Sequence, residues 1–348
     1  MRVVVTGGAG FIGSHLCERL IDRGDDVVCV DDFSSGVVDN VRHLTDSPRF
    51  LISRQDVSVG LAVDGHVDAV AHLASPASPP DYLRRPLETL AVGSRGTENA
   101  LVLAHRHRAR FIIASTSEVY GDPLTHPQRE SYWGNVNPIG PRSVYDEAKR
   151  FGEALTAAYR RAKGVNTGIV RIFNTYGVRM RADDGRVVSN FLTQALQGKP
   201  LSIYGSGDQT RSFCYVDDLV RGLLAMLDSD QPGPVNFGNP EERTVAELAR
   251  LVCRIVGRQA AVEYHDLPQD DPTRRCPDIT RARELFGWAP RVDIEEGLRR
   301  TAEWFAAQAE VTVAQSRGGR PGEALPLSAL VPPAGKPHGD EALVRSEA

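Results

Sequence analysis

The chain contains a small set of side chains whose types and spacing suit proton transfer. Tyr145 is followed four residues later by Lys149, so the two share one face if the segment is helical. Thr116, Ser117 and Glu118 follow an apolar run at residues 111–114. A tyrosine works as a general base near neutral pH when its pKa falls below the usual value of about 10, and a positive charge one helical turn away lowers it. We expect Tyr145 to act as a base, Lys149 to stabilise its phenolate, and the triplet to decide what happens to the substrate.

Each of these features also has an ordinary structural explanation. Tyr145 and Lys149 alone are typical of a surface pair on a helix. The triplet is also typical of a polar strand end that caps the following turn. A nucleotide-binding fold upstream would favour the catalytic interpretation.

The elements that must position these residues follow from the apolar pattern. Short apolar runs that end at glycine or polar residues predict buried strands. They lie at residues 3–6, 26–30, 50–52, 69–73, 111–114 and 167–172. Apolar side chains at helical spacing predict helices at residues 12–20, 87–107 and 145–161. Continuous apolar strands that alternate with amphipathic helices predict an α/β fold of the Rossmann type, with a doubly wound parallel sheet.

The pattern changes after about residue 176. Helices are predicted at 189–197, 244–256 and 293–307, and short strands at 201–204 and 260–264. We expect residues 1–175 to form the dinucleotide-binding domain, with some later segments returning to it, and residues 176–310 to form a smaller α/β lobe for substrate. Residues 311–348 contain five prolines and five glycines without periodicity, which predicts a disordered tail.

A glycine-rich turn joins the first predicted strand to the first predicted helix. Gly7, Gly10 and Gly13 have the spacing G-x-x-G-x-x-G, which permits a tight turn and lets backbone N–H groups approach a pyrophosphate. Asp31 ends the second strand, where a carboxylate binds ribose hydroxyls and repels a 2′-phosphate. The combination predicts NAD rather than NADP, in preference to a plain acidic loop. Asp56, after the third strand, could meet the adenine amino group.

Composition excludes several other classes. The 348 residues are 41% hydrophobic and 25% charged, as in a globular protein with a sizeable core. A net charge of −4 without a Lys/Arg cluster argues against nucleic acid and membrane lipids as partners. No apolar run is long enough to span a membrane, and no signal-peptide pattern precedes Val3. The five cysteines are scattered and lack metal-ligand spacing, so we expect free thiols, no metal and a cytoplasmic location.

The glycine spacing, Tyr145-x-x-x-Lys149 and Thr116 resemble the extended short-chain dehydrogenase/reductase family over roughly residues 1–310. Within this family, the chain resembles the members that decarboxylate UDP-glucuronate. The segments that carry this resemblance are 72–79, 114–121, 137–142, 171–177, 184–191, 204–207 and 269–272.

The resemblance implies a reaction. Tyr145, assisted by Thr116, takes the proton of the 4-hydroxyl while NAD accepts hydride from carbon 4. The ketone then accepts the electrons released when CO₂ leaves from carbon 5. Protonation of carbon 5 and the return of hydride to carbon 4 give UDP-xylose. Sugar 4,6-dehydratases carry an aspartate where Ser117 stands, because expelling a hydroxyl needs an acid, and simple 4-epimerases usually lack Glu118. Glu118 is expected to orient the ring or a water molecule and to crowd the substrate carboxylate.

The resemblance also implies contacts around the two ligands. Arg275 aligns with an arginine near the sugar carboxylate, and a guanidinium suits a planar anion. Arg186 and Arg211 are expected at the diphosphate, Tyr204 beside the uracil and Asn174 near the diphosphate. The remaining expected substrate contacts are Pro76, Glu118, Arg179, Val187 and Gln209, and the remaining cofactor contacts are Phe11, Ile12, Val57, Leu73 and Ala74, with Tyr145 and Lys149. The plainer alternatives are solvated arginines, a core tyrosine and a turn-forming asparagine.

The sequence departs from the family pattern at three positions, predicts a dimer and leaves three rival functions open. Gly93, Val178 and Cys276 stand where relatives commonly have Asn, Pro and Lys. The helices at 87–107 and 145–161 resemble those of a four-helix dimer interface, so we expect a homodimer. The rivals are an oxidative decarboxylase that releases UDP-4-keto-pentose and NADH, a nucleotide-sugar 4-epimerase or 4,6-dehydratase, and a nucleotide-sugar-binding regulator without activity.

Overall fold

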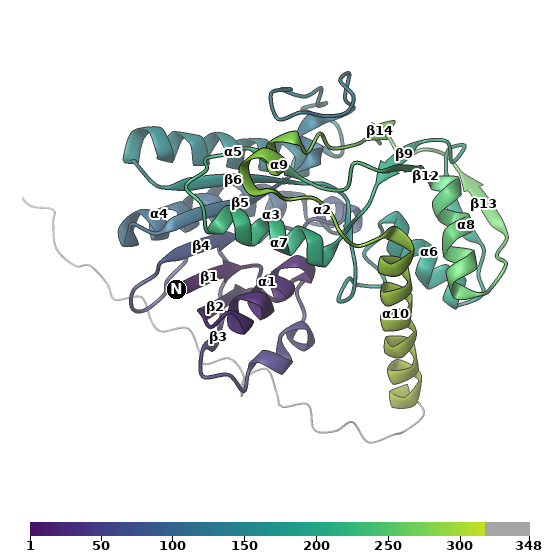
Figure 1. Cartoon of the computed structure of the whole chain (residues 1–348), viewed down its shortest axis with the longest axis horizontal. Coiled ribbons are helices and arrows are strands. Elements are labelled where there is room, and N and C mark those ends of the chain that lie inside the picture. Colours follow the sequence, from purple (N-terminus) through teal and green to yellow (C-terminus); the bar gives the residue numbers. More distant parts are fainter. Residues whose placement is uncertain (317–348) are drawn as a thin grey trace, which may run out of the picture.

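The computed structural model describes residues 1–316, and within this range the chain is built around a seven-stranded parallel sheet (Figure 1). The strand order is β11-β6-β5-β4-β1-β2-β3. The strands are β1 (Arg2–Thr6), β2 (Asp26–Asp31), β3 (Phe50–Arg54), β4 (Ala69–His72), β5 (Arg110–Thr116), β6 (Thr167–Ile172) and β11 (Val235–Phe237). All six strands predicted before residue 175 are present, and the predicted doubly wound parallel sheet is confirmed.

Both faces of the sheet are buried, because side chains alternate along each strand. On β1, Val3 and Val5 join one hydrophobic core and Val4 joins the other. Helices α1 (Phe11–Asp22) and α7 (Val216–Leu227) pack on the first face, and α4 (Thr97–His107) and α5 (Ser143–Lys163) on the second. The short helices α2 (Pro79–Arg84) and α3 (Pro86–Ala91) pack against α5. The strands are apolar at consecutive positions because neither face of the sheet is exposed to solvent.

A smaller lobe of short strands and helices lies beside the sheet (Figure 1). Its helices α6 (Val187–Leu196), α8 (Val245–Val256) and α10 (Ile294–Ser316) contact one another. Its strand pairs are β8 (Leu201–Tyr204) with β13 (Val262–His265), and β9 (Thr210–Ser212) with both β12 (Glu242–Thr244) and β14 (Arg274–Arg275). Further elements are β7 (Thr175–Tyr176), its partner β10 (Cys214–Tyr215), α9 (Thr280–Phe286), and the short 3-10 helices η1 (Val38–Asn40), η2 (Arg42–Leu44) and η4 (Ser117–Tyr120).

Two segments after residue 176 return to the large sheet. Helix α7 packs against α1, and β11 forms the sheet edge next to β6. The sequence predicts that some later segments return to the dinucleotide-binding domain, but it does not indicate which ones. The helix had a readable signal, since Val216, Leu219 and Leu223 follow helical spacing and all three are buried. Strand β11 is too short for a clear pattern.

The predicted helix at 87–107 is interrupted by a π turn, η3 (Val92–Gly96). At Gly93 a Cβ would lie 2.5 Å from the Cβ of Ala148 and 3.0 Å from its backbone. Glycine therefore lets the turn touch α5 one residue before Lys149. The departure at Gly93 fits close packing rather than a loosely held loop.

Helix α10 extends further than predicted. It ends at Ser316, so the first six residues of the expected tail are helical. Neither glycine nor proline occurs between Gly297 and Gly318, so nothing in the sequence breaks the helix earlier. The rest of the expected tail lies outside the described residues. Among the helices that are described, none is both long and apolar enough to cross a membrane.

Candidate active site

A cavity of about 940 Å³ opens at the carboxyl ends of the central strands and is closed on its far side by the smaller lobe. Strand β1 has β2 on one side and β4 on the other, so the chain reverses direction here and leaves a crevice. All the site residues predicted from the sequence line this cavity, with the exception of Arg179. Residues as far apart in the sequence as Gly7 and Arg275 therefore line the same cavity.

The glycine turn forms one end of the cavity. Gly7 has φ +69°, and its N–H bonds the carbonyl of Val30 at 2.8 Å. A Cβ at Gly13 would lie 2.1 Å from the carbonyl oxygen of Gly7, so a side chain there is excluded. Helix α1 begins after Gly10, which has no side chain to cap it, and its first turn contains no acidic residue. The amino-terminal N–H groups of α1 are thus suited to a phosphate.

Asp31 ends β2 beside this turn. Its carboxylate accepts hydrogen bonds from the N–H groups of Ala9, at 3.0 Å, and Phe33, at 2.9 Å. Burial raises the pKa of Asp31 to about 6, although these N–H groups oppose the shift. Asp56 also faces the cavity and accepts from the backbone N–H of Ser58 at 2.8 Å. A bare helix terminus and an acid at the next strand end fit a dinucleotide without a 2′-phosphate.

Tyr145, in the first turn of α5, lines the cavity. Its ring stacks on that of Tyr82 with centroids 5.2 Å apart, and its phenol shares a side-chain hydrogen bond with Thr116 at the end of β5. The Nζ of Lys149 donates to the carbonyl of Ala114 at 2.8 Å and lies 5.8 Å from the centre of the Tyr145 ring. The structure thus brings the predicted tyrosine, lysine and threonine together.

The pKa of Tyr145 shifts in the opposite direction to the one we expected. Burial raises it to about 12, and the hydrogen bond with Thr116 and the charge of Arg186 offset only part of this effect. Burial also lowers the pKa of Lys149 to about 8. In this structure the ammonium of Lys149 is directed at the carbonyl of Ala114, and desolvation dominates at the phenol. Tyr145 is therefore a neutral phenol near neutral pH.

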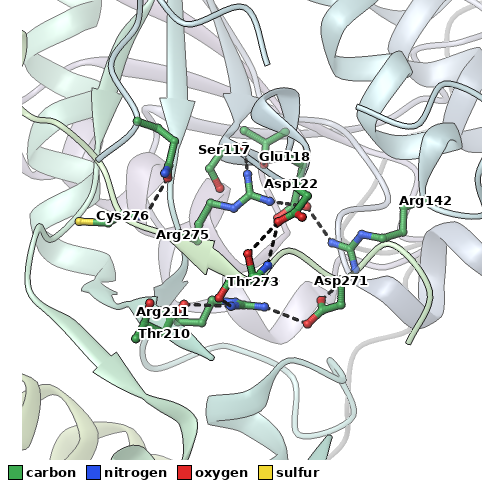
Figure 2. Close-up of polar contacts among 12 residues, drawn as sticks. Ser117, Glu118, Asp122, Arg142, Thr210, Arg211, Asp271, Thr273, Arg275 and Cys276 are labelled. Carbon is green, nitrogen blue, oxygen red and sulfur yellow. Dashed lines mark hydrogen bonds and ion pairs between the residues drawn. The ribbon is translucent and has the colours of Figure 1, made fainter. Parts of the chain in front are cut away.

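Glu118 is held between two arginines that come from distant parts of the chain (Figure 2). Arg142 donates to its Oε2 at 2.7 Å and Arg275 donates to the same oxygen at 3.2 Å. Arg275 also donates to the carbonyl of Ser117, and its side chain is 1% exposed. Burial alone would raise the pKa of Glu118, but the charges of Arg275 and then Arg142 outweigh it and lower the pKa to about 2. Glu118 is therefore ionised at any physiological pH.

A third arginine extends this network. Arg211 donates to Asp271 at 2.8 Å, and the same carboxylate lies 3.5 Å from Arg142. Three guanidiniums thus face the carboxylates of Glu118 and Asp271. Nearby Asp146, whose pKa burial and the charge of Glu118 raise to about 7, is only partly ionised, so the network keeps a positive excess that suits an anionic ligand. Neither Arg142 nor Asp271 is among the residues predicted from the sequence, although they lie in the segments 137–142 and 269–272 that carry the family resemblance.

Arg179, predicted as a substrate contact, does not line this cavity. Its Nη2 donates to Glu18 of α1 at 2.8 Å and lies 3.4 Å from His43. Arg181 lines the cavity instead and donates to Asp81 at 2.9 Å. Glu18 stands 161 residues before Arg179, so sequence spacing could not reveal the carboxylate that draws Arg179 away.

The remaining predicted contacts form the wall toward the smaller lobe. Arg186 lies 3.0 Å from Asp184 in an ion pair, and Tyr204 is 44% exposed at the rim. The amide of Gln209 donates to the carbonyl of Tyr204 at 2.6 Å. The other lining residues on this side are Pro76, Asn174 and Val187. The wall thus offers arginine, aromatic and amide groups to an elongated ligand.

A parallel sheet that presents a glycine turn, an acidic strand end and a tyrosine–lysine pair to one cavity defines a dinucleotide-dependent short-chain dehydrogenase/reductase. Comparison with known protein families identifies the family within this class of dehydrogenases/reductases. The chain belongs to the NAD dependent epimerase/dehydratase family, whose family model matches residues 3–238. Its cofactor is NAD, in agreement with the prediction from Asp31.

Relatives and solved structures share most of the chain. UDP-glucuronic acid decarboxylase 1 of Arabidopsis thaliana is 52% identical over 305 residues, which cover 88% of this chain and 70% of the relative. UDP-glucuronic acid decarboxylase 1 of Danio rerio is 50% identical over 309 residues, which cover 89% and 73%. The structure of UDP-glucuronic acid 4-epimerase from Bacillus cereus, in complex with UDP-glucuronic acid and NAD, aligns with a TM-score of 0.78 at 28% identity and covers 88% of this chain and 100% of that one.

Proposed function

We propose that this chain decarboxylates UDP-glucuronate to UDP-xylose in an NAD-dependent reaction that leaves NAD unchanged overall. The observation that carries the proposal is the state of the two residues after Thr116. Ser117 is a poor acid, and Glu118 is kept ionised by Arg142 and Arg275. Neither residue is suited to protonate a leaving hydroxyl, whereas loss of CO₂ needs no such acid. Two relatives at about 50% identity that bear the name of this activity support the same conclusion.

The proposed chemistry begins with oxidation of the sugar at carbon 4. NAD, when bound, supplies the acceptor for the hydride of carbon 4 and later its donor. Tyr145, with Thr116 hydrogen-bonded to its phenol, is the proposed acceptor of the 4-hydroxyl proton, and the positive charge of bound NAD⁺ would favour the phenolate that this step needs. Oxidation makes the substrate a β-keto acid, so the ketone accepts the electron pair released from the bond between carbon 5 and the carboxylate. Carbon 5 then takes up a proton, and carbon 4 regains its hydride and its oxygen regains a proton, which gives UDP-xylose. The hydrogen bond from Lys149 to the carbonyl of Ala114 holds α5, and with it Tyr145, against the end of β5.

Arg275 and Glu118 are proposed to handle the substrate carboxylate together. The excess positive charge of the arginine network attracts an anionic sugar, and the planar donors of Arg275 suit a carboxylate. The ionised Glu118 then lies close to the same anion and disfavours it electrostatically. Release of neutral CO₂ removes this repulsion. We infer that Arg275 binds the carboxylate and that Glu118 favours its departure.

The remaining parts of the chain are assigned by the same proposal. Residues 1–175, with the returning segments, bind NAD through Gly7, Gly10, Gly13 and Asp31. Residues 176–310 hold the nucleotide, with Arg186 and Arg211 at the diphosphate and Tyr204 beside the uracil. We further propose a homodimer through α4 and α5, and a cytoplasmic location. The exposed Phe151 on α5 and Val102 on α4 support an interface there.

One experiment separates this proposal from its rivals. The purified protein is incubated with UDP-glucuronate and NAD, and CO₂, nucleotide-sugar products and NADH are measured together, with a Tyr145→Phe preparation as control. We expect equal amounts of CO₂ and UDP-xylose without net NADH. UDP-4-keto-pentose with stoichiometric NADH would favour the oxidative decarboxylase. UDP-galacturonate without CO₂ would favour a 4-epimerase, a rival with some support because the Bacillus cereus epimerase shares the fold. Binding without turnover would favour the regulator.

A further inference from the structure

Three side chains that commonly bind metals lie together outside the cavity. They are His126, Glu242 and Cys276, and their ligand atoms all lie within 4.8 Å of one another. The imidazole Nε2 of His126 is 2.8 Å from Oε2 of Glu242. Cys276 directly follows Arg275, and Figure 2 shows its thiol directed away from the arginine guanidinium. The cluster therefore belongs to a separate site on the other side of the β14 segment.

The donor set and spacing suit a divalent transition metal. A tetrahedral zinc site places nitrogen and oxygen about 2.0–2.2 Å and sulfur about 2.3 Å from the ion, so its ligands lie roughly 3–4 Å apart. The three atoms here need only small side-chain adjustments to reach that spacing. One thiolate and one carboxylate would neutralise both charges of the ion, and imidazole is neutral as a ligand.

Burial and access also fit an ion that enters from solvent. Cys276 is 4% exposed, whereas the side chains of His126 and Glu242 are 29% and 26% exposed. The thiol thus forms the floor of the site, and the other two ligands reach the surface. A water molecule at the open side would complete four-coordinate geometry.

The surrounding contacts fix the ligands in place. Oε1 of Glu242 accepts from the hydroxyl of Thr210 at 2.6 Å, which leaves Oε2 for the ion. The backbone of Cys276 is held on both sides by Gln128, through its side-chain oxygen and its backbone N–H, each at 2.8 Å. Such supporting bonds orient ligands before the metal arrives.

We propose that His126, Glu242 and Cys276 form a binding site for a thiophilic divalent cation, for which Zn²⁺ is the best fit. The ligands come from the segment between β5 and α5, from β12 and from the residue after β14. A bound ion would cross-link these three segments one residue away from Arg275. The site is independent of the proposed reaction, so its test does not depend on turnover.

The test uses Co²⁺ with untagged protein, because a cobalt–thiolate bond gives a charge-transfer band that zinc lacks. We expect the band to saturate at one ion per chain and to disappear when Zn²⁺ is added, since zinc ranks above cobalt in affinity. Cys276→Ser should abolish the band. Cys253→Ser, which changes a partly buried cysteine on α8 outside the cluster, should leave it unchanged. Thr210→Val, which removes a supporting bond, should weaken binding about 10- to 100-fold.

The proposal fails if the wild-type chain shows no band, or if the band persists in Cys276→Ser or vanishes in Cys253→Ser. His126→Gln provides a second variant at a more exposed position, where misfolding is not expected. Its cobalt titration should saturate only at higher concentrations than the wild type. An unchanged titration would overturn the assignment of His126 as a ligand and, with it, the three-residue site.

Discussion

The phenol of Tyr145 is buried beside Thr116 and keeps its proton near neutral pH, because desolvation raises its pKa to about 12. A substrate hydroxyl that reaches this site would hydrogen-bond to the phenol of Tyr145 or to the hydroxyl of Thr116. Glu118 differs in character, since two arginines hold it as a carboxylate. The side chains proposed to act at carbon 4 and carbon 5 therefore have distinct protonation states before any ligand binds.

Removing the Tyr145 hydroxyl tests the first of these groups. Tyr145→Phe should lower the single-turnover rate by about 10²- to 10⁴-fold, the usual contribution of general acid–base catalysis, while binding changes little. Rapid mixing with UDP-glucuronate under single-turnover conditions measures that rate. Tyr159→Phe, on the same helix but far from the cavity lining, is the matched control and should behave as wild type. A normal rate in Tyr145→Phe would remove this tyrosine from the mechanism.

Arg275 and its neighbour Arg274 form a natural pair for testing carboxylate recognition, because the first is buried and the second exposed. Arg275→Ala should weaken UDP-glucuronate at least about tenfold, which corresponds to about 1.4 kcal/mol, and weaken UDP much less. Arg274→Ala should change neither. Calorimetric titration with both ligands provides the comparison.

The Arg275→Ala variant needs both a binding comparison and a stability measurement. Equal weakening of UDP-glucuronate and UDP would mean that Arg275 holds the diphosphate. Loss of a partner from a buried ion pair also costs about 3–5 kcal/mol, so the unfolding free energy of Arg275→Ala should fall as well. Measuring it by denaturant titration shows whether enough folded protein is present for the binding comparison.

At the scale of elements, α5 decides where the catalytic side chains lie. It carries both Tyr145 and Lys149, and it is pressed against the π turn η3 at Ala148 and against β5 at Gly152. A Cβ at Gly152 would lie 2.9 Å from a methyl of Ile113. Small residues at these two contacts therefore set the distance between α5 and the strand that ends in Thr116.

Enlarging the residue at the π turn should displace α5. In Gly93→Ala the new Cβ would meet Ala148 at 2.5 Å, so we expect a loss of about 1–3 kcal/mol in unfolding free energy, as in other overpacked sites. The turnover number should fall more than the affinity for UDP-glucuronate, because the displaced helix carries Tyr145. Gly60→Ala is the control, since a Cβ there meets nothing within 4 Å. A wild-type rate in Gly93→Ala would show that the packing absorbs the methyl group.

At the scale of the whole molecule, the chain crosses between the large sheet and the smaller lobe more than once. Helix α7 and strand β11 bring it back to the sheet after the lobe has begun, and β12 and β14 then return to the lobe. The cavity is lined from both sides, so its shape depends on these crossings. The outer surface formed by α3, α4 and α5 carries exposed apolar side chains, which are Leu87 and Leu90 on α3, Val102 on α4 and Phe151 on α5.

This outer surface is where a second copy of the chain is expected. Phe151→Asp should shift the protein from dimer to monomer, because a carboxylate in the centre of an apolar interface is buried without a partner. Leu124→Asp changes an exposed leucine away from these helices and should leave the dimer intact. Analytical ultracentrifugation over a range of concentrations distinguishes the two. A wild-type chain that is monomeric throughout would contradict the homodimer itself.

Much of the site was readable from the sequence because its parts are local. The glycine turn, the acid after β2 and the i, i+4 pair on α5 each lie within one element or at its end, where short-range geometry decides. The features that the sequence did not indicate depend on distant groups. Arg179 turned to Glu18, the pKa of Tyr145 rose through burial, and Arg142 and Asp271 gained their role only through contact with Glu118 and Arg211.

By itself, the sequence determined the parallel sheet and the dependence on NAD, because periodicity and spacing act over a few residues, and the family resemblance supplied the groups proposed to act at carbon 4. The tertiary structure decided the charge states and partners of those groups. It placed Arg275 against Glu118 from 157 residues away and put Cys276 beside His126 and Glu242. Electrostatic and packing interactions act through space, so only the folded chain brings their participants within range.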